Sequence, residues 1–185
     1  TENVKAAAEA MGKEVSDLTV VVLDRPRHEK IIQELRQCGA RIKLITDGDV
    51  SPAVATCIED SGIDMMIGIG GAPEGVLAAA AIRSLGGEFM GRLWPENEAE
   101  TARAAEMLGG DPTRLLYMHD LVKTEDVIFA ASGVTDGELL KGVRFYGDVA
   151  TTHTIVMRGE TGTVRFLETR HCLDRKPKNI QEIIR

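Results

Sequence analysis

The sequence predicts an α/β protein: a three-layer helix-sheet-helix domain with a mainly parallel sheet, followed by a C-terminal antiparallel hairpin. In the first half of the 185 residues, short apolar runs typical of buried strands alternate with segments whose apolar residues recur at helical spacing. In the last third, two stretches alternate between apolar and polar residues, as the strands of a hairpin do. We therefore expect residues 1–132 to form a domain of consecutive βαβ units, and residues 133–185 to complete the fold with the hairpin and a short helix.

The first elements are marked by clear boundaries. An opening helical pattern ends at Gly12, a residue that tolerates the positive φ of a helix C-cap. Thr19 to Leu23 (TVVVL) is a continuous β-branched run, which is typical of a strand covered on both faces. An amphipathic segment then ends at Gly39, and Arg41 to Thr46 (RIKLIT) predicts a second strand.

The next units repeat this order. Ser51 is a favoured N-cap residue, and it predicts a helix that ends near Gly62. Asp64 to Ile82 (DMMIGIGGAPEGVLAAAAI) predicts a buried strand, a glycine turn and a buried helix with Pro73 in its first turn. A fourth run, Glu88 to Leu93, would complete three consecutive βαβ crossovers in one parallel sheet.

The second half is less regular. It predicts one helix, two short strands, the hairpin and a C-terminal helix. The ranges are 96–108 for the helix, 114–118 and 126–131 for the strands, 151–158 and 163–169 for the hairpin, and residues after 178 for the last helix.

Composition excludes several partners. The net charge is −7, so no broad basic face is expected to bind nucleic acid or anionic lipid. The longest apolar stretch is far shorter than the roughly 20 residues that span a bilayer. Cys38, Cys57 and Cys172 have no metal-ligand spacing and are interpreted as reduced core thiols. We expect a soluble, cytoplasmic protein.

Residues that carry chemistry follow each of the first three predicted strands. Ligands of open parallel sheets bind beyond the carboxyl ends of the strands, and these ends meet at one edge. The residues are Asp24, Arg25, Arg27 and His28 after the first strand, Asp47, Gly48 and Asp49 after the second, and Gly70, Gly71 and Glu74 after the third.

These junctions favour a phosphate ligand. Gly48 and Gly71 allow close approach of the backbone and offer N–H groups near helix N-termini. Arg25 and Arg27 flank the rigid Pro26, and each could bind a phosphate with a charge-assisted hydrogen bond of roughly 1.5–3 kcal/mol. A single arginine would be read as a solvated surface charge, but two at one junction favour a binding site.

The carboxylates of Asp47, Asp49 and Glu74 would repel a phosphate unless a divalent cation or sugar hydroxyls lie between them. Oxygen ligands suit Mg²⁺ or Mn²⁺, although one carboxylate cannot hold such an ion alone. The simpler interpretation of Glu74 is a favourable interaction with the helix macrodipole, worth roughly 0.3–1 kcal/mol.

Other sites are excluded by spacing. A dinucleotide-binding G-x-G-x-x-G that starts at Gly68 would need glycine at Pro73, and the chain has no phosphate-loop motif that ends in G-K-[ST]. A lone Trp94 argues against base stacking. The histidines show no zinc spacing and are interpreted as ordinary polar or capping residues; they are His28, His119, His153 and His171.

Four motifs resemble class II fructose-1,6-bisphosphatases, a family that includes bifunctional fructose/sedoheptulose bisphosphatases. They are LDRPRHEK (23–30), TDGDV (46–50), IGGAPEGV (69–76) and SGVTDGELLKGV (132–143). The resemblance implies a fold like that of the lithium-sensitive sugar phosphatases and a requirement for Mg²⁺ or Mn²⁺. It implies Glu74 as a metal ligand and the following substrate-binding residues: Arg25, Pro26, Arg27, Asp47, Gly48, Asp49 and Gly71. It assigns no catalytic residue to this chain.

The resemblance covers only the C-terminal part of that family, whose N-terminal half supplies the other acidic metal ligands. We therefore expect a part of an enzyme that hydrolyses the 1-phosphate of fructose 1,6-bisphosphate in gluconeogenesis, with residues 1–132 as the substrate-binding domain. This part alone is expected to be inactive, and the complete protein is expected to be a homo-oligomer. The alternative is a non-catalytic sugar-phosphate binding or regulatory module.

Overall fold

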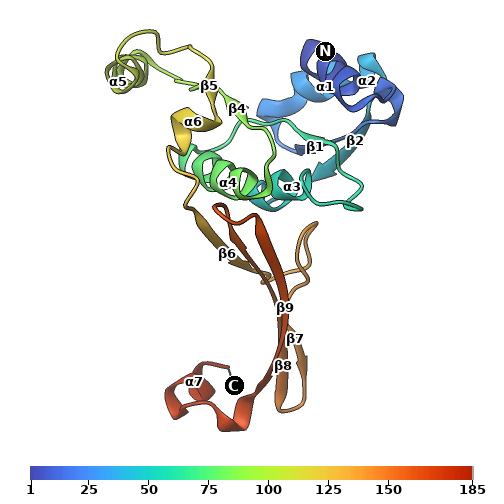
Figure 1. Ribbon diagram of the computed structural model, residues 1–185, viewed down its shortest axis with the longest axis vertical. Coiled ribbons are helices and arrows are strands. Elements are labelled where there is room, and N and C mark those ends of the chain that lie inside the picture. Colours follow the sequence, from blue (N-terminus) through green and yellow to red (C-terminus); the bar gives the residue numbers. More distant parts are fainter. Residues whose placement is uncertain (185) are drawn as a thin grey trace.

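The computed structural model describes residues 1–184 and has alternating layers of helices and strands (Figure 1). Helices α1 (Glu2–Met11) and α2 (Glu29–Cys38) cover one face of a parallel sheet. Helices α3 (Val50–Ala55) and α4 (Ala72–Leu85) lie on its other face, and an antiparallel sheet packs against the far side of these two helices.

The parallel sheet, sheet A, has the strand order β2-β1-β3. Its strands are β1 (Thr19–Leu23), β2 (Arg41–Ile45) and β3 (Met65–Met66). Val20 and Val22 of β1 pack with α1 and α2, whereas Val21 packs with Ala55 of α3. Because successive side chains of a strand point to opposite faces, the continuous β-branched run of β1 fills both interfaces. The α/β class with a mainly parallel sheet and helices on both faces is confirmed.

The prediction of a third crossover is wrong. Strand β4 (Met90–Gly91) does not join sheet A but pairs antiparallel with β5 (Leu116–Tyr117) in a separate sheet, sheet B. Phe89 packs against the cluster that α3 and α4 form, while Met90 is 60% exposed. Phe89 therefore covers the helices, and the run does not extend the parallel sheet.

Helix α3 begins earlier and ends earlier than predicted. Its N-cap is Asp49, and Ser51 lies inside the helix, where its hydroxyl accepts a hydrogen bond of 3.3 Å from the Leu139 N–H. The last helical residue is Ala55, so the prediction of an end near Gly62 is also wrong. Ser51 therefore joins α3 to a distant loop instead of capping the helix.

The antiparallel sheet, sheet C, confirms the predicted hairpin. Strands β8 (Val149–Arg158) and β9 (Thr163–Cys172) pair along their whole length. The other edge of β8 pairs with β6 (Ile128–Ser132) and with β7 (Arg144–Tyr146), a strand that the sequence did not predict. Ile155 and Met157 of β8 are fully buried against α3 and α4.

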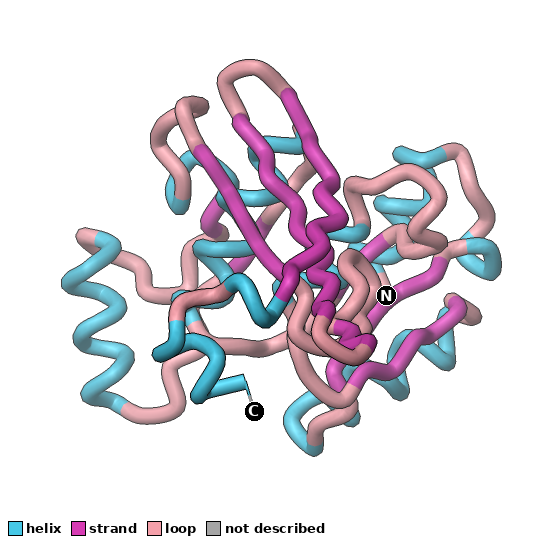
Figure 2. The backbone as a smooth tube through the Cα atoms, turned by 90° about the horizontal axis from the view of Figure 1, so that it is seen from below, coloured by secondary structure: helices cyan, strands magenta, loops and turns pink. Residues whose placement is uncertain are grey.

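The half of sheet C that contains β7 extends away from α3 and α4. Figure 2, seen from below, shows its strands running side by side. Phe145 is 61% exposed and Tyr146 is 65% exposed in this half. Cys172 is also exposed, so its interpretation as a core thiol is wrong, while Cys38 and Cys57 are half-buried.

The remaining elements connect these layers. Helix α5 (Glu98–Leu108) is capped by the Asn97 side chain, and α6 (Met118–Leu121) starts where the predicted strand 114–118 should end. Short 3₁₀ helices and the last helix complete the chain: η1 (Val15–Asp17), η2 (Pro26–His28), η3 (Leu173–Arg175) and α7 (Lys178–Ile184). None of the described helices is long and apolar enough to cross a membrane.

Candidate functional site

The register of sheet A brings the three junctions to one edge. Leu23 at the end of β1 lies beside Ile45 at the end of β2, and Met66 at the end of β3 lies beside Val21. All three strands are parallel, so the chain leaves each of them in the same direction. We call residues 24–28, 46–49 and 68–74, which follow these strand ends, the rim.

Hydrogen bonds join the first junction of the rim to the third. The Nε–H of Arg27 donates to the carbonyl oxygen of Ile69 at 2.8 Å, and the Ile69 N–H donates to Nε2 of His28 at 2.8 Å. The other ring nitrogen of His28, Nδ1, lies 2.8 Å from the Leu23 carbonyl oxygen. Both peptide groups of Ile69 are therefore held by neighbouring residues of the first junction.

His28 is fully buried, with 0% of its surface exposed. Because a carbonyl oxygen only accepts, Nδ1 carries the hydrogen of the neutral ring and donates to Leu23. Nε2 then accepts from the Ile69 N–H at 2.8 Å, the shorter of its two contacts with Ile69, whose carbonyl oxygen lies 3.1 Å away. The interpretation of His28 as an ordinary polar or capping residue missed this bridge. The sequence signal was its position next to Arg27 at a strand end, but its partner lies 41 residues away.

A close approach of Asp49 and Gly70 links the second junction to the third. A Cβ atom on Gly70 would lie 2.7 Å from Oδ2 of Asp49. Asp47 instead stays within its own loop, where its carboxylate accepts a hydrogen bond of 2.8 Å from the Gly48 N–H. Gly48 has a φ of +77°, a conformation that favours glycine. Its N–H is used by Asp47, so the prediction that this group donates to a phosphate is not met in this arrangement.

The N-terminus of α4 carries Gly71 and Glu74. Gly71 is the N-cap of this 14-residue helix, and Glu74 lies in the first turn. A Cβ atom on Gly71 would collide with the carboxylate of Glu74, so this side chain folds back over the N-cap. Within residues 1–184, neither the Gly70 nor the Gly71 N–H donates a hydrogen bond. Two backbone donors therefore lie beside one carboxylate at a helix N-terminus, where the macrodipole favours an anion.

Most of the predicted site residues are exposed on this edge. Asp49 is half-buried, whereas Arg25, Pro26, Arg27, Asp47, Gly48, Gly71 and Glu74 are exposed. Pro26 begins η2, and the Arg25 carbonyl oxygen accepts a hydrogen bond from the His28 N–H at 2.8 Å. The side chains of Arg27, Asp49 and Glu74 thus approach the turn at Gly70 and Gly71, which we call the glycine turn. Arg25 and Asp47 lie on the same edge, in the loops beside it.

The rim does not provide a complete metal site. Among residues 1–184, no group of three or more His, Cys, Asp or Glu side chains is placed to hold a metal ion. Mg²⁺ and Mn²⁺ prefer nearly octahedral oxygen coordination. The donors of this chain therefore do not fit such an ion by themselves, and Glu74 could supply at most one of several ligands.

The motif at residues 132–143 lies beside the rim without joining it. The Leu139 N–H donates to Ser51, two residues after Asp49, and Glu138 pairs with Lys43 of β2. Within the motif, the backbone N–H of Gly142 and the Arg144 guanidinium hold the pKa of Asp136 below its usual value. The motif therefore connects sheet C to the middle of β2 and the start of α3.

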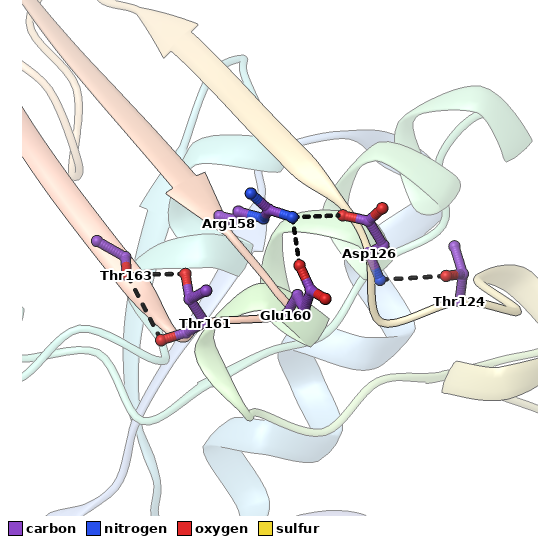
Figure 3. Close-up of polar contacts among 6 residues, drawn as sticks. All are labelled: Thr124, Asp126, Arg158, Glu160, Thr161 and Thr163. Carbon is purple, nitrogen blue, oxygen red and sulfur yellow. Dashed lines mark hydrogen bonds and ion pairs between the residues drawn. The ribbon is translucent and has the colours of Figure 1, made fainter.

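Two cavities lie away from the rim. One of about 400 Å³ is lined by Arg83, Glu125 and Gly159, among others, and the second, of about 470 Å³, lies beside Tyr146 of sheet C. Figure 3 shows the turn next to the first cavity, where Arg158 reaches Asp126 and Glu160. These polar contacts close the end of the hairpin.

Comparison with known proteins covers nearly the whole chain. Residues 1–171 match the family model described as bacterial fructose-1,6-bisphosphatase, glpX-encoded. The chain is 44% identical over 193 residues to the D-fructose 1,6-bisphosphatase class 2/sedoheptulose 1,7-bisphosphatase of Synechococcus sp. (strain JA-2-3B'a(2-13)), covering 97% of this chain and 56% of that protein. It is 42% identical over 185 residues to the fructose-1,6-bisphosphatase class 2 of Haemophilus influenzae, covering 94% of this chain and 56% of that protein. It is 41% identical over 193 residues to the fructose-1,6-bisphosphatase 1 class 2 of Escherichia coli (strain K12), covering 97% of this chain and 57% of that protein.

The chain spans just over half the length of these relatives. The matched region includes every residue of the rim. The chain belongs to the family of glpX-encoded bacterial fructose-1,6-bisphosphatases.

Proposed function

We propose that this chain binds the phosphate of a sugar bisphosphate at the rim, as part of an enzyme that hydrolyses the 1-phosphate of fructose 1,6-bisphosphate. The observation that carries this proposal is the attachment of Arg27 to the glycine turn through its 2.8 Å bond to Ile69. That bond uses one of the five N–H donors of the guanidinium, so the others remain for an anion. Gly70 and Gly71 add backbone donors at the N-terminus of α4.

We assign the residues of the rim to two roles. Arg25, Arg27 and Gly71 would bind phosphate oxygens, with Pro26 fixing the backbone between the arginines. Asp47 and Asp49 carry carboxylates that only accept hydrogen bonds, so sugar hydroxyls are their natural partners. Gly48 would act through its φ of +77°, which allows the turn that carries both aspartates.

We propose Glu74 as one ligand of a Mg²⁺ or Mn²⁺ ion whose other ligands come from outside this chain. When bound, such an ion would polarise the phosphate and activate water. Glu74 is exposed at the helix N-terminus, and no group of three or more His, Cys, Asp or Glu side chains in residues 1–184 is placed to hold a metal ion. Both observations support ligands from outside this chain. Phosphate binding by the arginines and the glycine N–H groups would need no ion.

The resemblance of the motifs at 23–30, 46–50 and 69–76 supports placing this chain in the C-terminal part of the complete enzyme. The names of the relatives, fructose and sedoheptulose bisphosphatases, support a sugar bisphosphate as the substrate. The role in gluconeogenesis, the cytoplasmic location, the homo-oligomer and the division at residue 132 stay predictions.

The second candidate is a non-catalytic sugar-phosphate binding module. One observation favours it: the described residues carry phosphate donors but lack a complete metal site. Both candidates predict that the 185-residue chain binds a sugar phosphate. They differ in whether the chain can support hydrolysis when the rest of the enzyme is supplied.

A chimera tests the difference. The region of the Escherichia coli relative that matches this chain would be replaced by this chain, and hydrolysis of fructose 1,6-bisphosphate would be followed with excess Mn²⁺. We expect the isolated chain to bind the substrate in metal-free buffer, to hydrolyse it no faster than background, and the chimera to regain turnover. The double variant Arg25→Gln/Arg27→Gln serves as the control for binding at the rim.

The possible outcomes separate the candidates. Binding by the isolated chain with an inactive but folded chimera would favour the non-catalytic module. If the double variant binds the substrate as tightly as the original chain, the ligand lies away from the rim, and both assignments are contradicted. Rapid metal-dependent turnover by the isolated chain would show that carboxylates within it complete the metal site.

A further inference from the structure

His28 has no role in the phosphate contacts proposed above, yet it is fully buried and both of its ring nitrogens face backbone groups. Nδ1 donates to the Leu23 carbonyl oxygen at the end of β1. Nε2 accepts from the N–H of Ile69, the residue before Gly70 and Gly71. The ring thus spans the distance between a strand of sheet A and the glycine turn.

A neutral imidazole suits this position because it carries a donor and an acceptor on one small rigid ring. An apolar side chain would fill the space but leave the Ile69 N–H without its partner, and an unpaired buried donor costs about 1–3 kcal/mol. The Cε1 and Nε2 atoms of His28 also lie within ordinary contact distance, 3.9 and 3.7 Å, of a Cβ built on Gly68. The ring therefore packs beneath the start of the turn as well as bonding to it.

We propose that His28 is a positioning residue for phosphate binding: it fixes the glycine turn relative to the arginines of the first junction. This inference rests on the proposed function of the rim. Ile69 is held from both sides, by His28 at its N–H and by Arg27 at its carbonyl oxygen. The Gly70 and Gly71 donors and the Arg27 guanidinium consequently keep one relative arrangement before the ligand arrives, which lowers the ordering cost of binding.

Two variants separate the two bonds of the ring. In His28→Asn the side-chain amide lies near the position of Nδ1 and can still donate to Leu23, but it is too short to reach Ile69. In His28→Gln the side-chain oxygen reaches the position of Nε2 and can accept from the Ile69 N–H. His119→Asn is the matched control, because the His119 side chain is 75% exposed.

Three measurements are made on the 185-residue chain: amide hydrogen exchange at Ile69, the unfolding temperature, and the Kd for inorganic phosphate and for fructose 1,6-bisphosphate. We expect His28→Asn to speed exchange at Ile69 and to raise both Kd values about tenfold, the effect of one lost hydrogen bond. His28→Gln should stay within about threefold of the original chain in both, even where the two variants unfold at similar temperatures. The control should change none of these quantities.

Two results would overturn the positioning role: His28→Asn binding as tightly as the original chain, or both variants losing affinity equally in line with their loss of stability. A failure of the original chain to bind either ligand would refute the proposed function of the rim. In that case amide exchange at Ile69 still tests the hydrogen bond between Ile69 and His28 separately, because unchanged exchange in His28→Asn would contradict that bond.

Discussion

Sheets A and C of this molecule differ in how they are covered and in what they carry. Sheet A has short parallel strands enclosed by helices on both faces, and the residues assigned to the site follow its strand ends. Sheet C has two ten-residue strands that pair along their whole length, and helices α3 and α4 cover only part of one face. Its other half exposes Phe145 and Tyr146.

This difference predicts that ligand binding and stability depend on different residues. The side chains of the rim are mostly exposed, so substitutions there should change ligand binding more than folding. The contact between sheet C and the helices is buried, so substitutions there should change folding first.

The largest expected effect is in the buried half of sheet C. Met157→Ala should lower the free energy of unfolding by about 2–5 kcal/mol, because Met157 is 0% exposed and packs in the cluster that includes Val54 and Ala81. Phe145→Ser, in the exposed half, should change it by less than about 0.5 kcal/mol. Urea denaturation of both variants measures the difference. Equal losses would mean that the exposed half is covered in solution.

Two glycine substitutions sharpen the comparison. In Gly142→Ala the new Cβ would lie 2.7 Å from the backbone carbon of Thr135, which cannot move easily, so we expect a loss of about 1–3 kcal/mol. In Gly71→Ala the new Cβ meets only the flexible Glu74 carboxylate, so stability should change by less than about 0.5 kcal/mol while phosphate binding weakens. Thermal unfolding and calorimetric titration test the pair. A reversed order, with Gly71→Ala the less stable variant, would be inconsistent with this geometry.

Asp64 lies at the opposite end of sheet A from the rim. Burial raises the pKa of Asp64, but the hydrogen bonds from Lys13 and from the Thr19 N–H outweigh it and hold this pKa below its usual value. A lowered pKa stabilises the folded state above the ordinary value of about 3.9, and this contribution is lost as the pH falls through the folded-state pKa.

We therefore expect Asp64→Asn to be about 1–2 kcal/mol less stable than the original chain at pH 7, with the difference shrinking below about pH 4. Denaturation series between pH 7 and pH 3 provide the measurement. A difference that stays constant over this range would show that the charge of Asp64 does not contribute. Phosphate affinity should be unchanged at pH 7, because Asp64 is remote from the rim.

Glu74→Ala should lower stability less than Met157→Ala, Gly142→Ala or Asp64→Asn. Only the interaction with the helix macrodipole is at stake, so the loss should be about 0.3–1 kcal/mol. In the chimera with the Escherichia coli relative, the same change should abolish most of the turnover if Glu74 is a metal ligand. Lost stability with retained turnover would restore the simpler structural interpretation of this residue.

The sequence predicted sheet A and the location of the rim because both depend on local patterns. The run TVVVL gives β1 with the predicted bounds, and parallel strands connected by helices must end at one edge. The shared edge places Asp49 and Gly70 on the same side of the sheet, and the structure brings them close together.

The missed features depend on contacts between distant residues. Strand β4 does not join the parallel sheet, and Phe89 beside it packs on α3 and α4. The local sequence pattern does not predict this contact. The role of His28 depends on a glycine turn 41 residues away that folds over its ring. The Gly48 N–H was expected to meet a ligand, but the neighbouring Asp47 side chain reaches it first.

The most direct test of the rim is an NMR titration of the 185-residue chain with fructose 1,6-bisphosphate in metal-free buffer. We expect saturable shifts of the Gly70 and Gly71 amide signals and of the Arg27 Nε–H signal, with little change in sheet C. Inorganic sulfate should shift the same signals at higher concentration. Saturable binding that leaves these three signals unchanged, or no binding without a metal ion, would contradict a phosphate site built from the arginines and the glycine turn.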